Sequence, residues 1–283
     1  KHTAKDYHNQ SVNPPVVRAS TIIFKSMQDI RKTQNKAKID PTGGHYDYGR
    51  QGTSTTYILS QILKKMEESH HVFLTPTGFG AVFLAIFSVT RPGDEIVVAD
   101  PTYSPTRLLT QSFLKEFNIK STFYNPHDLK TLEKVITNKT KLIFVENPGS
   151  NSFDFQDLGK IISIAKKNRI LTAIDNTWGT PYFLKPIKLG FDMSIVSATK
   201  YYSGHSDVMG GSLAVNKKVF KAVEKANKIT GLRLGPDDAY LITRGLRTLD
   251  VRLDKHEKSS KDVADFLSKY KNIKLLYPHK KDS

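Results

Sequence analysis

The sequence predicts an α/β protein with a mostly parallel central sheet and helices packed around it. From about residue 57, short apolar runs alternate with longer segments of helical pattern, which is typical of βαβ units. Polar groups directly follow several of the apolar runs, as expected where ligands bind at the carboxyl ends of parallel strands. The 283 residues, 38% of them hydrophobic, are sufficient for a large core.

The elements follow one another regularly after an irregular start. Turn signals at residues 13–15 and 41–44 predict that residues 1 to about 45 form an irregular arm. Short apolar runs then predict strands, and longer segments with helical spacing predict helices. In order, we expect helix 57–69, strand 72–74, helix 78–90, strand 95–99, helix 104–117, strand 121–124, helix 128–137, strand 142–145, helix 157–168, strand 171–174 and strand 193–196. From Pro236 to about Tyr270 the pattern is mostly helical.

Composition excludes several classes of protein. The longest apolar run, residues 81–89, is far below the ~20 residues of a membrane span, and no signal peptide is visible, so we expect a cytoplasmic protein. The absence of cysteine excludes disulfides and thiolate sites, and the adjacent His70 and His71 cannot share one helix face, so no metal site is expected. The net charge of +16 comes from scattered lysines rather than a basic stripe, which argues against a nucleic-acid partner.

Candidate functional groups follow the predicted strands. Asp175 comes directly after one apolar run, Lys200 lies shortly past another, and Tyr103 follows the strand at 95–99. Because the carboxyl ends of parallel strands meet at one edge, we expect these groups to lie together. A lysine in that setting can form an imine with an aldehyde, an aspartate can keep a pyridine nitrogen protonated, and an aromatic ring can stack on the pyridine.

A phosphate cradle is indicated at the start of the helix at 78–90. Gly78 and the Phe79 N–H lie at a helix N-terminus, where free N–H groups and the helix dipole favour an anion. Ser197 and Thr199 offer hydroxyl donors beside the lysine. Taken singly, each signal has a simpler explanation, because a lone aspartate after a strand is more often a cap and a lone lysine is usually solvated. Their shared placement supports the interpretation.

Four motifs carry a resemblance to a known family. Residues 197–207 (SATKYYSGHSD) closely resemble the pyridoxal-phosphate lysine motif of the cystathionine lyase and synthase family of transsulfuration enzymes. Residues 48–53 (YGRQGT), 175–178 (DNTW) and 244–249 (RGLRTL) match further motifs of that family, and the resemblance covers nearly the whole chain. It implies pyridoxal 5′-phosphate as cofactor and the fold type I of such enzymes, the aspartate aminotransferase-like fold.

The resemblance also implies a role for each candidate residue. Lys200 is the lysine that binds the cofactor and moves protons, Asp175 pairs with the pyridine nitrogen, and Tyr103 stacks on the ring and helps to activate the incoming amine. The implied phosphate ligands are Gly78, Phe79, Ser197 and Thr199, with Tyr48 and Arg50 reaching the phosphate of a neighbouring subunit's cofactor. A homodimer is then the minimum active unit, and a tetramer is expected.

Within the family, the chain resembles the cystathionine β-lyases. Trp178, the turn at 146–150 (ENPGS) and residues 243–247 (TRGLR) carry this resemblance, whereas γ-acting relatives more often have Phe and Asn in place of Trp178 and Ser150. The implied reaction of methionine biosynthesis is α,β-elimination of the amino-acid substrate cystathionine to homocysteine, pyruvate and ammonia, with alanine racemisation as a side activity. The alternatives are a γ-lyase or γ-synthase, or a cofactor-binding protein without lyase activity.

The resemblance divides the chain into three segments. Residues 1–50 are the expected arm, residues 51–246 the expected pyridoxal-phosphate-binding domain, and residues 247–283 the expected start of a C-terminal domain. In the family, that domain carries an arginine that grips the substrate carboxylate, and no matching arginine motif is present here. We therefore expect a C-terminal domain that is largely missing.

Overall fold

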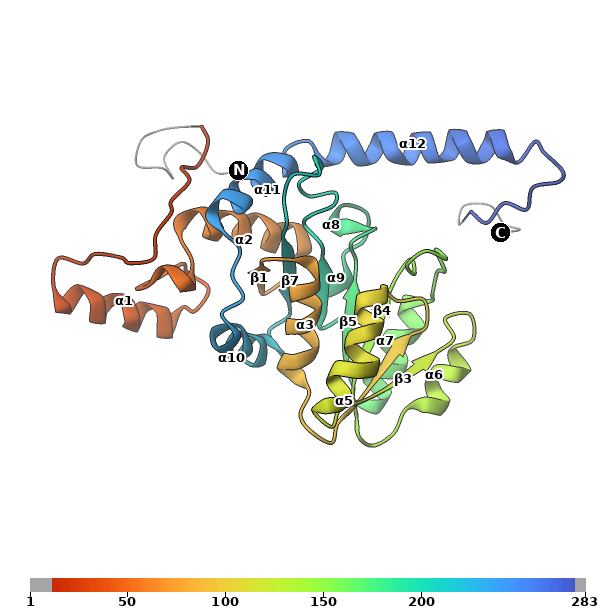
Figure 1. Ribbon diagram of the computed structural model, residues 1–283, viewed down its shortest axis with the longest axis horizontal. Coiled ribbons are helices and arrows are strands. Elements are labelled where there is room, and N and C mark those ends of the chain that lie inside the picture. Colours follow the sequence, from red (N-terminus) through yellow and green to blue (C-terminus); the bar gives the residue numbers. More distant parts are fainter. Residues whose placement is uncertain (1–11, 278–283) are drawn as a thin grey trace.

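A seven-stranded sheet forms the centre of the computed structural model, which describes residues 12–277 (Figure 1). The strand order is β1-β7-β6-β5-β4-β2-β3. Strands β3, β2, β4, β5 and β6 run parallel, while β7 runs antiparallel to both of its neighbours. The strands are β1 His71–Thr75, β2 Glu95–Ala99, β3 Lys120–Tyr124, β4 Thr140–Glu146, β5 Leu171–Asp175, β6 Met193–Val196 and β7 Gly211–Val215. The predicted mostly parallel sheet is confirmed.

Helices connect and cover these strands. They are α1 Met27–Ile39, α2 Ser54–Glu67, α3 Gly78–Val89, α4 Ser104–Leu108, α5 Leu114–Glu116, α6 Leu129–Val135, α7 Leu158–Asn168, α8 Thr180–Phe183, α9 Pro186–Leu189, α10 Phe220–Thr230, α11 Pro236–Leu246 and α12 Leu249–Leu267. A 3₁₀ turn, η2 Gly49–Gln51, precedes α2, and a π-helical segment, η3 Leu109–Phe113, joins α4 to α5. Within residues 12–277 no helix is both long and apolar enough to cross a bilayer.

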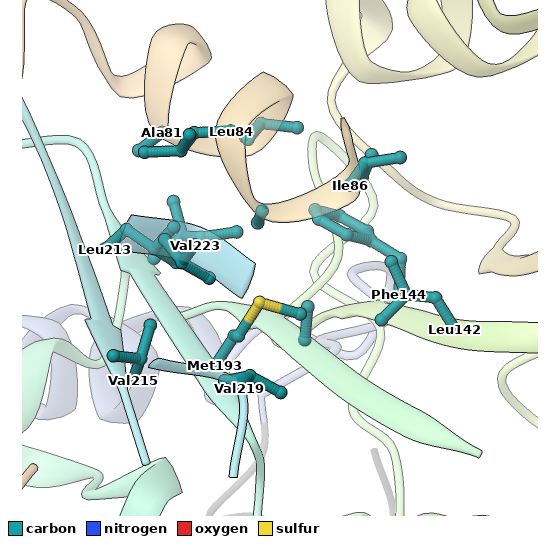
Figure 2. Close-up of a cluster of buried hydrophobic side chains, with 14 of the residues drawn as sticks. Ala81, Leu84, Ile86, Leu142, Phe144, Met193, Leu213, Val215, Val219 and Val223 are labelled. Carbon is teal, nitrogen blue, oxygen red and sulfur yellow. The ribbon is translucent and has the colours of Figure 1, made fainter. Parts of the chain in front are cut away.

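Alternate strand residues build two cores, one on each face of the sheet. On one face, α3 and α10 pack over β4, β6 and β7, as Figure 2 shows for Leu84, Phe144, Met193, Leu213 and Val223. On the other face, α2, α11 and the start of α12 cover β1, β6 and β7, while α6 and α7 cover β2, β4 and β5. The result is a three-layer arrangement in which the carboxyl ends of the parallel strands share one edge.

The prediction of an irregular N-terminal arm is wrong over one stretch, because α1 forms there. Ser26 caps this helix by accepting a hydrogen bond from the Asp29 N–H at 3.2 Å, and no residue of α1 is buried. A polar helix that buries nothing has no apolar stripe, so the pattern that reveals other helices is missing. Figure 1 shows α1 and α12 extending from opposite sides of the molecule.

The strand β7 and the helix α10 were not predicted from the sequence. All five residues of β7 are buried, but the run is short and starts at a glycine. It lies beside β6 in antiparallel register, Ile195 opposite Leu213, and so closes the loop that follows Lys200. The three predicted segments stay predictions, and the outer ends of the first and last lie outside the described residues.

Candidate active site

The N-terminus of α3 lies against the turn that follows β6. Gly78 permits this approach, because a Cβ there would lie 2.6 Å from both Cβ and Oγ of Ser197. Thr77 caps the helix, its hydroxyl accepting from the Gly80 N–H at 2.9 Å. Within the described part of the chain, no hydrogen bond engages the Gly78 and Phe79 N–H groups or the Ser197 hydroxyl. These three donors therefore face one small region at a helix N-terminus, where an anion is favoured.

The Thr199 hydroxyl is hydrogen-bonded to the backbone of Gly210, a contact that the sequence did not indicate. Its hydroxyl donates to the Gly210 carbonyl at 3.2 Å and lies 3.1 Å from the Gly210 N–H, from which it accepts. These bonds fasten the turn after β6 to the residue that precedes β7. A contact between Thr199 and a phosphate stays a prediction.

Lys200 lies exposed in a turn fixed by backbone hydrogen bonds. Its N–H donates to the Ser197 carbonyl at 3.1 Å, and its own carbonyl accepts from the Gly204 N–H at 2.9 Å. Among residues 12–277, its Nζ has no hydrogen-bond or ion-pair partner. The backbone is therefore held while the amine stays accessible.

Asp175 ends β5 and is joined to the Lys200 turn through Thr177. The Thr177 hydroxyl donates to Asp175 Oδ1 at 2.6 Å and accepts from the Ser197 N–H at 2.9 Å, and the Thr177 N–H donates to the same Oδ1 at 3.0 Å. Both bonds to the carboxylate use Oδ1, which leaves Oδ2 for another donor. Thr177 was not singled out from the sequence, although its position two residues after the aspartate is a common spacing for such a turn.

Glu146 is a second acid at this edge, and its place is fixed from two sides. It ends β4 directly opposite Asp175 in the register of the parallel strands. Its Oε2 accepts from the Tyr103 N–H at 2.6 Å and from the Thr102 hydroxyl at 3.2 Å. The sequence signal was a carboxylate at the end of an apolar strand, which marked the position but not its pairing with Asp175.

Burial and mutual repulsion shift the titration of this acid pair. Loss of water around Glu146, and then the charge of Asp175, raise the pKa of Glu146. Burial likewise raises the pKa of Asp175, although the Thr177 hydrogen bonds oppose this shift. In the part of the chain that the structure describes, neither carboxyl group has an ion-pair partner. The pair therefore favours a cation or a charged N–H donor next to it.

Tyr103 carries the aromatic ring that is predicted to stack on the cofactor. This residue precedes α4, its N–H is held by Glu146, and its side chain is 47% exposed. Trp178 is also half-exposed, with its ring edge-on to Phe153 at 5.1 Å and 6.2 Å from Tyr201, next to Lys200. Both aromatic residues are thus partly accessible to solvent.

Among residues 12–277, no hydrogen bond or ion pair joins Tyr48 or Arg50 to the other candidate residues. Tyr48 bridges to Thr21, and Arg50 donates to the Lys228 carbonyl at 3.0 Å, at the end of α10. Both are exposed. Their predicted contact with the cofactor of another subunit stays a prediction.

The arrangement fits pyridoxal phosphate. The cradle of Gly78, Phe79 and Ser197 supplies three free donors for a phosphate, the Asp175 carboxylate keeps one oxygen for a protonated pyridine nitrogen, and the Lys200 amine is open for an aldehyde. No cluster of three or more His, Cys, Asp or Glu side chains able to hold a metal ion occurs in residues 12–277.

Comparison with known proteins gives consistent results. The whole chain, residues 1–283, matches the family described as "Cys/Met metabolism PLP-dependent enzyme". Cystathionine β-lyase of Haemophilus influenzae is 34% identical over 276 residues, which cover 96% of this chain and 68% of that protein. L-alanine/L-glutamate racemase of Wolbachia pipientis is 34% identical over 274 residues, 95% of this chain and 68% of that protein. The chain thus spans about two thirds of each relative.

A solved structure shows the same architecture. An enzyme of Campylobacter jejuni that contains N′-pyridoxyl-lysine-5′-monophosphate superposes with a TM-score of 0.86 and 28% sequence identity, over 96% of this chain and 75% of that one. The expected fold type and the expected cofactor are thereby confirmed. The chain belongs to the family of pyridoxal-phosphate-dependent enzymes of cysteine and methionine metabolism.

Proposed function

We propose that the protein catalyses α,β-elimination of sulfur amino acids, with cystathionine as the substrate. The observation that carries the proposal is the placement of an accessible Lys200 amine beside Asp175 and a phosphate cradle at one sheet edge. The resemblance of Trp178 and the turn at 146–150 to β-lyases, together with a cystathionine β-lyase among the relatives, supports β- rather than γ-elimination.

Each residue of the site has a task in this proposal. Gly78, Phe79, Ser197 and Thr199 bind the phosphate, and Asp175 accepts a hydrogen bond from the pyridine N–H. Glu146 holds the Tyr103 N–H and so fixes the start of the segment whose ring stacks on the cofactor. Lys200 attaches the cofactor and afterwards accepts the substrate's α-proton.

Water is the only further reactant that the proposed elimination of cystathionine needs. Pyridoxal phosphate, when bound, supplies an electron sink for the electrons that the α-proton leaves behind. The Cβ–S bond then breaks, homocysteine leaves after protonation at sulfur, and the remaining three-carbon unit is hydrolysed to pyruvate and ammonia. Lys200 is the proposed proton carrier, because its Nζ has no other partner in the described residues.

Alanine racemisation is proposed as a side activity. A base that removes an α-proton inverts the centre when a proton returns to the opposite face. The racemase of Wolbachia pipientis among the relatives supports this proposal. We also propose a cytoplasmic homo-oligomer, at least a dimer, in which Tyr48 and Arg50 reach a neighbouring cofactor; the exposure of both side chains supports a contact with a neighbouring subunit.

Two measurements test the function. Borohydride reduction of the purified protein with its cofactor, followed by peptide mass spectrometry, should place the pyridoxyl group on the peptide containing Lys200. Lys200→Ala should abolish this adduct, whereas Lys217→Ala, at an exposed lysine after β7, should leave it intact. Incubation with cystathionine should then release pyruvate; release of 2-oxobutyrate would instead identify a γ-acting enzyme, and no keto acid would contradict the lyase proposal.

A further inference from the structure

Helix α12 is attached to the rest of the protein mainly through its first two turns. Leu249 and Leu253 are each 2% exposed and belong to the same core cluster as Tyr202. In the remainder of the helix only Ala264 is buried. The attached end of α12 and the end of α11 therefore lie next to the Lys200 turn, which comprises residues 197–204.

The end of α11 contacts the backbone of this turn at Gly245. A Cβ on Gly245 would lie 2.3 Å from the carbonyl oxygens of both Tyr202 and Ser203, so a residue with a side chain could not come this close. The Ser203 N–H donates to the Ala198 carbonyl at 3.1 Å, within the turn. The backbone of α11 thus packs directly against the backbone that follows the lysine.

Arg252 of α12 contacts the turn beside Gly245. Its Nη2 donates to the Gly245 carbonyl at 2.9 Å and its Nε donates to the Thr248 hydroxyl at 3.2 Å, so the guanidinium is fixed where α11 meets α12. Gly204, with a φ of 74°, lies against it, because a Cβ there would be 2.6 Å from both Cζ and Nη1 of Arg252. The Gly204 N–H donates to the Lys200 carbonyl at 2.9 Å. The guanidinium therefore packs on the residue that closes the turn on the lysine.

Two further contacts join α12 to segments around the turn. The ring of His256, one helical turn after Arg252, lies 5.8 Å from the ring of Tyr201, which follows the lysine. Asp254 accepts a hydrogen bond from the Tyr182 hydroxyl of α8 at 2.7 Å. In the described part of the chain, Arg252 has no ion-pair partner. Its contribution is therefore one of shape and directed hydrogen bonds rather than of paired charge.

We propose that Arg252 is a positioning residue for Lys200: its guanidinium, fixed by the α11–α12 junction, holds Gly204 in place and so sets the direction in which the backbone presents the lysine amine. The inference rests on the proposed function, in which this amine attaches the cofactor. Among residues 12–277, no hydrogen bond joins Arg252 to Asp175 or to the phosphate cradle. Loss of Arg252 should thus impair attachment of the cofactor without weakening its non-covalent binding.

The first experiment separates attachment from binding in Arg252→Ala. Cofactor-free protein is mixed with pyridoxal 5′-phosphate, and the visible imine band should appear about tenfold more slowly than in the unaltered protein. Pyridoxine 5′-phosphate has no aldehyde, so its dissociation constant measures non-covalent binding and should be unchanged. Lys255→Ala removes an exposed cationic side chain from the same helix and should alter neither value. An unchanged rate in Arg252→Ala would overturn the proposal, as would equal weakening of both compounds, which indicates a merely structural helix cap.

Arg252→Lys tests whether charge alone is sufficient. Lysine keeps the positive charge but lacks the planar fork that reaches two acceptors at once. We expect this variant to attach the cofactor as slowly as Arg252→Ala does. A normal rate in Arg252→Lys would contradict a role based on shape.

Gly204→Ala tests the contact itself. The added methyl group meets the guanidinium in the unaltered protein but finds space in Arg252→Ala, whereas the strain of a positive φ is present in both. The substitution should therefore slow attachment several-fold less in the Arg252→Ala background. Equal effects in the two backgrounds would refute the contact. If Gly204→Ala does not fold, the two Arg252 variants decide alone.

Amide exchange keeps this inference separable from the proposed function. A protein whose Lys200 attaches no cofactor would refute the proposed function. The Gly204 amide should still exchange about tenfold faster in Arg252→Ala than in the unaltered protein, because the residue has lost the group that packs on it. An unchanged exchange rate would show that Arg252 does not hold the turn.

Discussion

Glu146 and Asp175 are register partners at the ends of neighbouring parallel strands, so two carboxyl groups lie side by side at the edge of the sheet. One is anchored by the start of the Tyr103 segment and the other by Thr177, which also holds the Lys200 turn. The segments that follow β2 and β6 are therefore connected, through the ends of β4 and β5, to two acids whose pKa values burial raises. A positive charge or a strong hydrogen-bond donor is therefore favoured next to this pair.

Removing the charge of Asp175 should weaken cofactor function more than cofactor attachment. In Asp175→Asn, the pyridine nitrogen loses its carboxylate partner, and we expect kcat/KM to fall by roughly 100-fold or more. Steady-state assays with cystathionine measure this loss, and absorbance titration measures cofactor affinity. Asp128→Asn, at the cap of α6, is the control and should leave both values unchanged, because asparagine also caps helices. Normal turnover in Asp175→Asn would remove the assigned role.

Glu146→Gln should change how the cofactor-free protein responds to pH. The folded state raises the pKa of Glu146 above its usual value of 4.5, so it binds more protons than the unfolded chain does and loses stability as pH rises past that value. Glutamine removes this titration and the repulsion of Asp175, while its carbonyl can still accept from Tyr103. Melting temperatures between pH 4 and pH 8 should therefore decline less in the variant. A parallel decline in both proteins would contradict the proposed acid pair.

A methyl group at Gly78 should obstruct the phosphate cradle. The Cβ of Gly78→Ala would lie 2.6 Å from Ser197, so helix and turn must separate, at a cost of about 1–3 kcal/mol. We expect the dissociation constant for pyridoxal phosphate to rise about tenfold or more. Gly159→Ala in α7 adds the same group where the nearest atom is 3.5 Å away, and it should bind the cofactor normally. Equal affinities in the two variants would rule out the cradle.

Glu67→Gln should stabilise the protein increasingly as pH rises. Burial raises the pKa of Glu67 from its usual 4.5 to about 8, so between these values the folded state holds a proton that the unfolded state releases. Stability is therefore lost as pH rises from 4.5 through about 8. The melting temperature of the variant relative to the unaltered protein should grow over that range.

Much of the sheet could be predicted because its strands are short apolar runs, and the helices between them have a clear periodicity of hydrophobic residues. The strand 95–99 was predicted with its observed bounds, and Lys200 lies past the end of β6 as expected, whereas Asp175, predicted to follow a strand, is the last residue of β5. Helix α1 could not be predicted, because a helix without a buried face has no amphipathic pattern. The strand β7 was missed because four residues after a glycine give too short a periodicity.

The candidate site could be predicted only in part, because the contacts between its side chains depend on tertiary packing. Glu67 continues the Leu59–Leu63 face of α2, so a charge at an apolar position was a readable signal. A pairing between residues far apart in the chain cannot be predicted in this way, because such residues meet only through packing. The same holds for Glu146 and Asp175, whose register depends on how two strands align.

The antiparallel strand β7 also bears on the order of assembly during synthesis. β1 pairs with β7 from His71 opposite Val215 to Thr75 opposite Gly211, so the strand that leads into the phosphate cradle waits for residues made much later. Such long-range pairing slows folding. A nascent chain that has not yet delivered β7 lacks the neighbour that holds β1 beside the lysine strand. The strand before the phosphate cradle therefore gains its only sheet neighbour among the described residues when residues 211–215 have been synthesised.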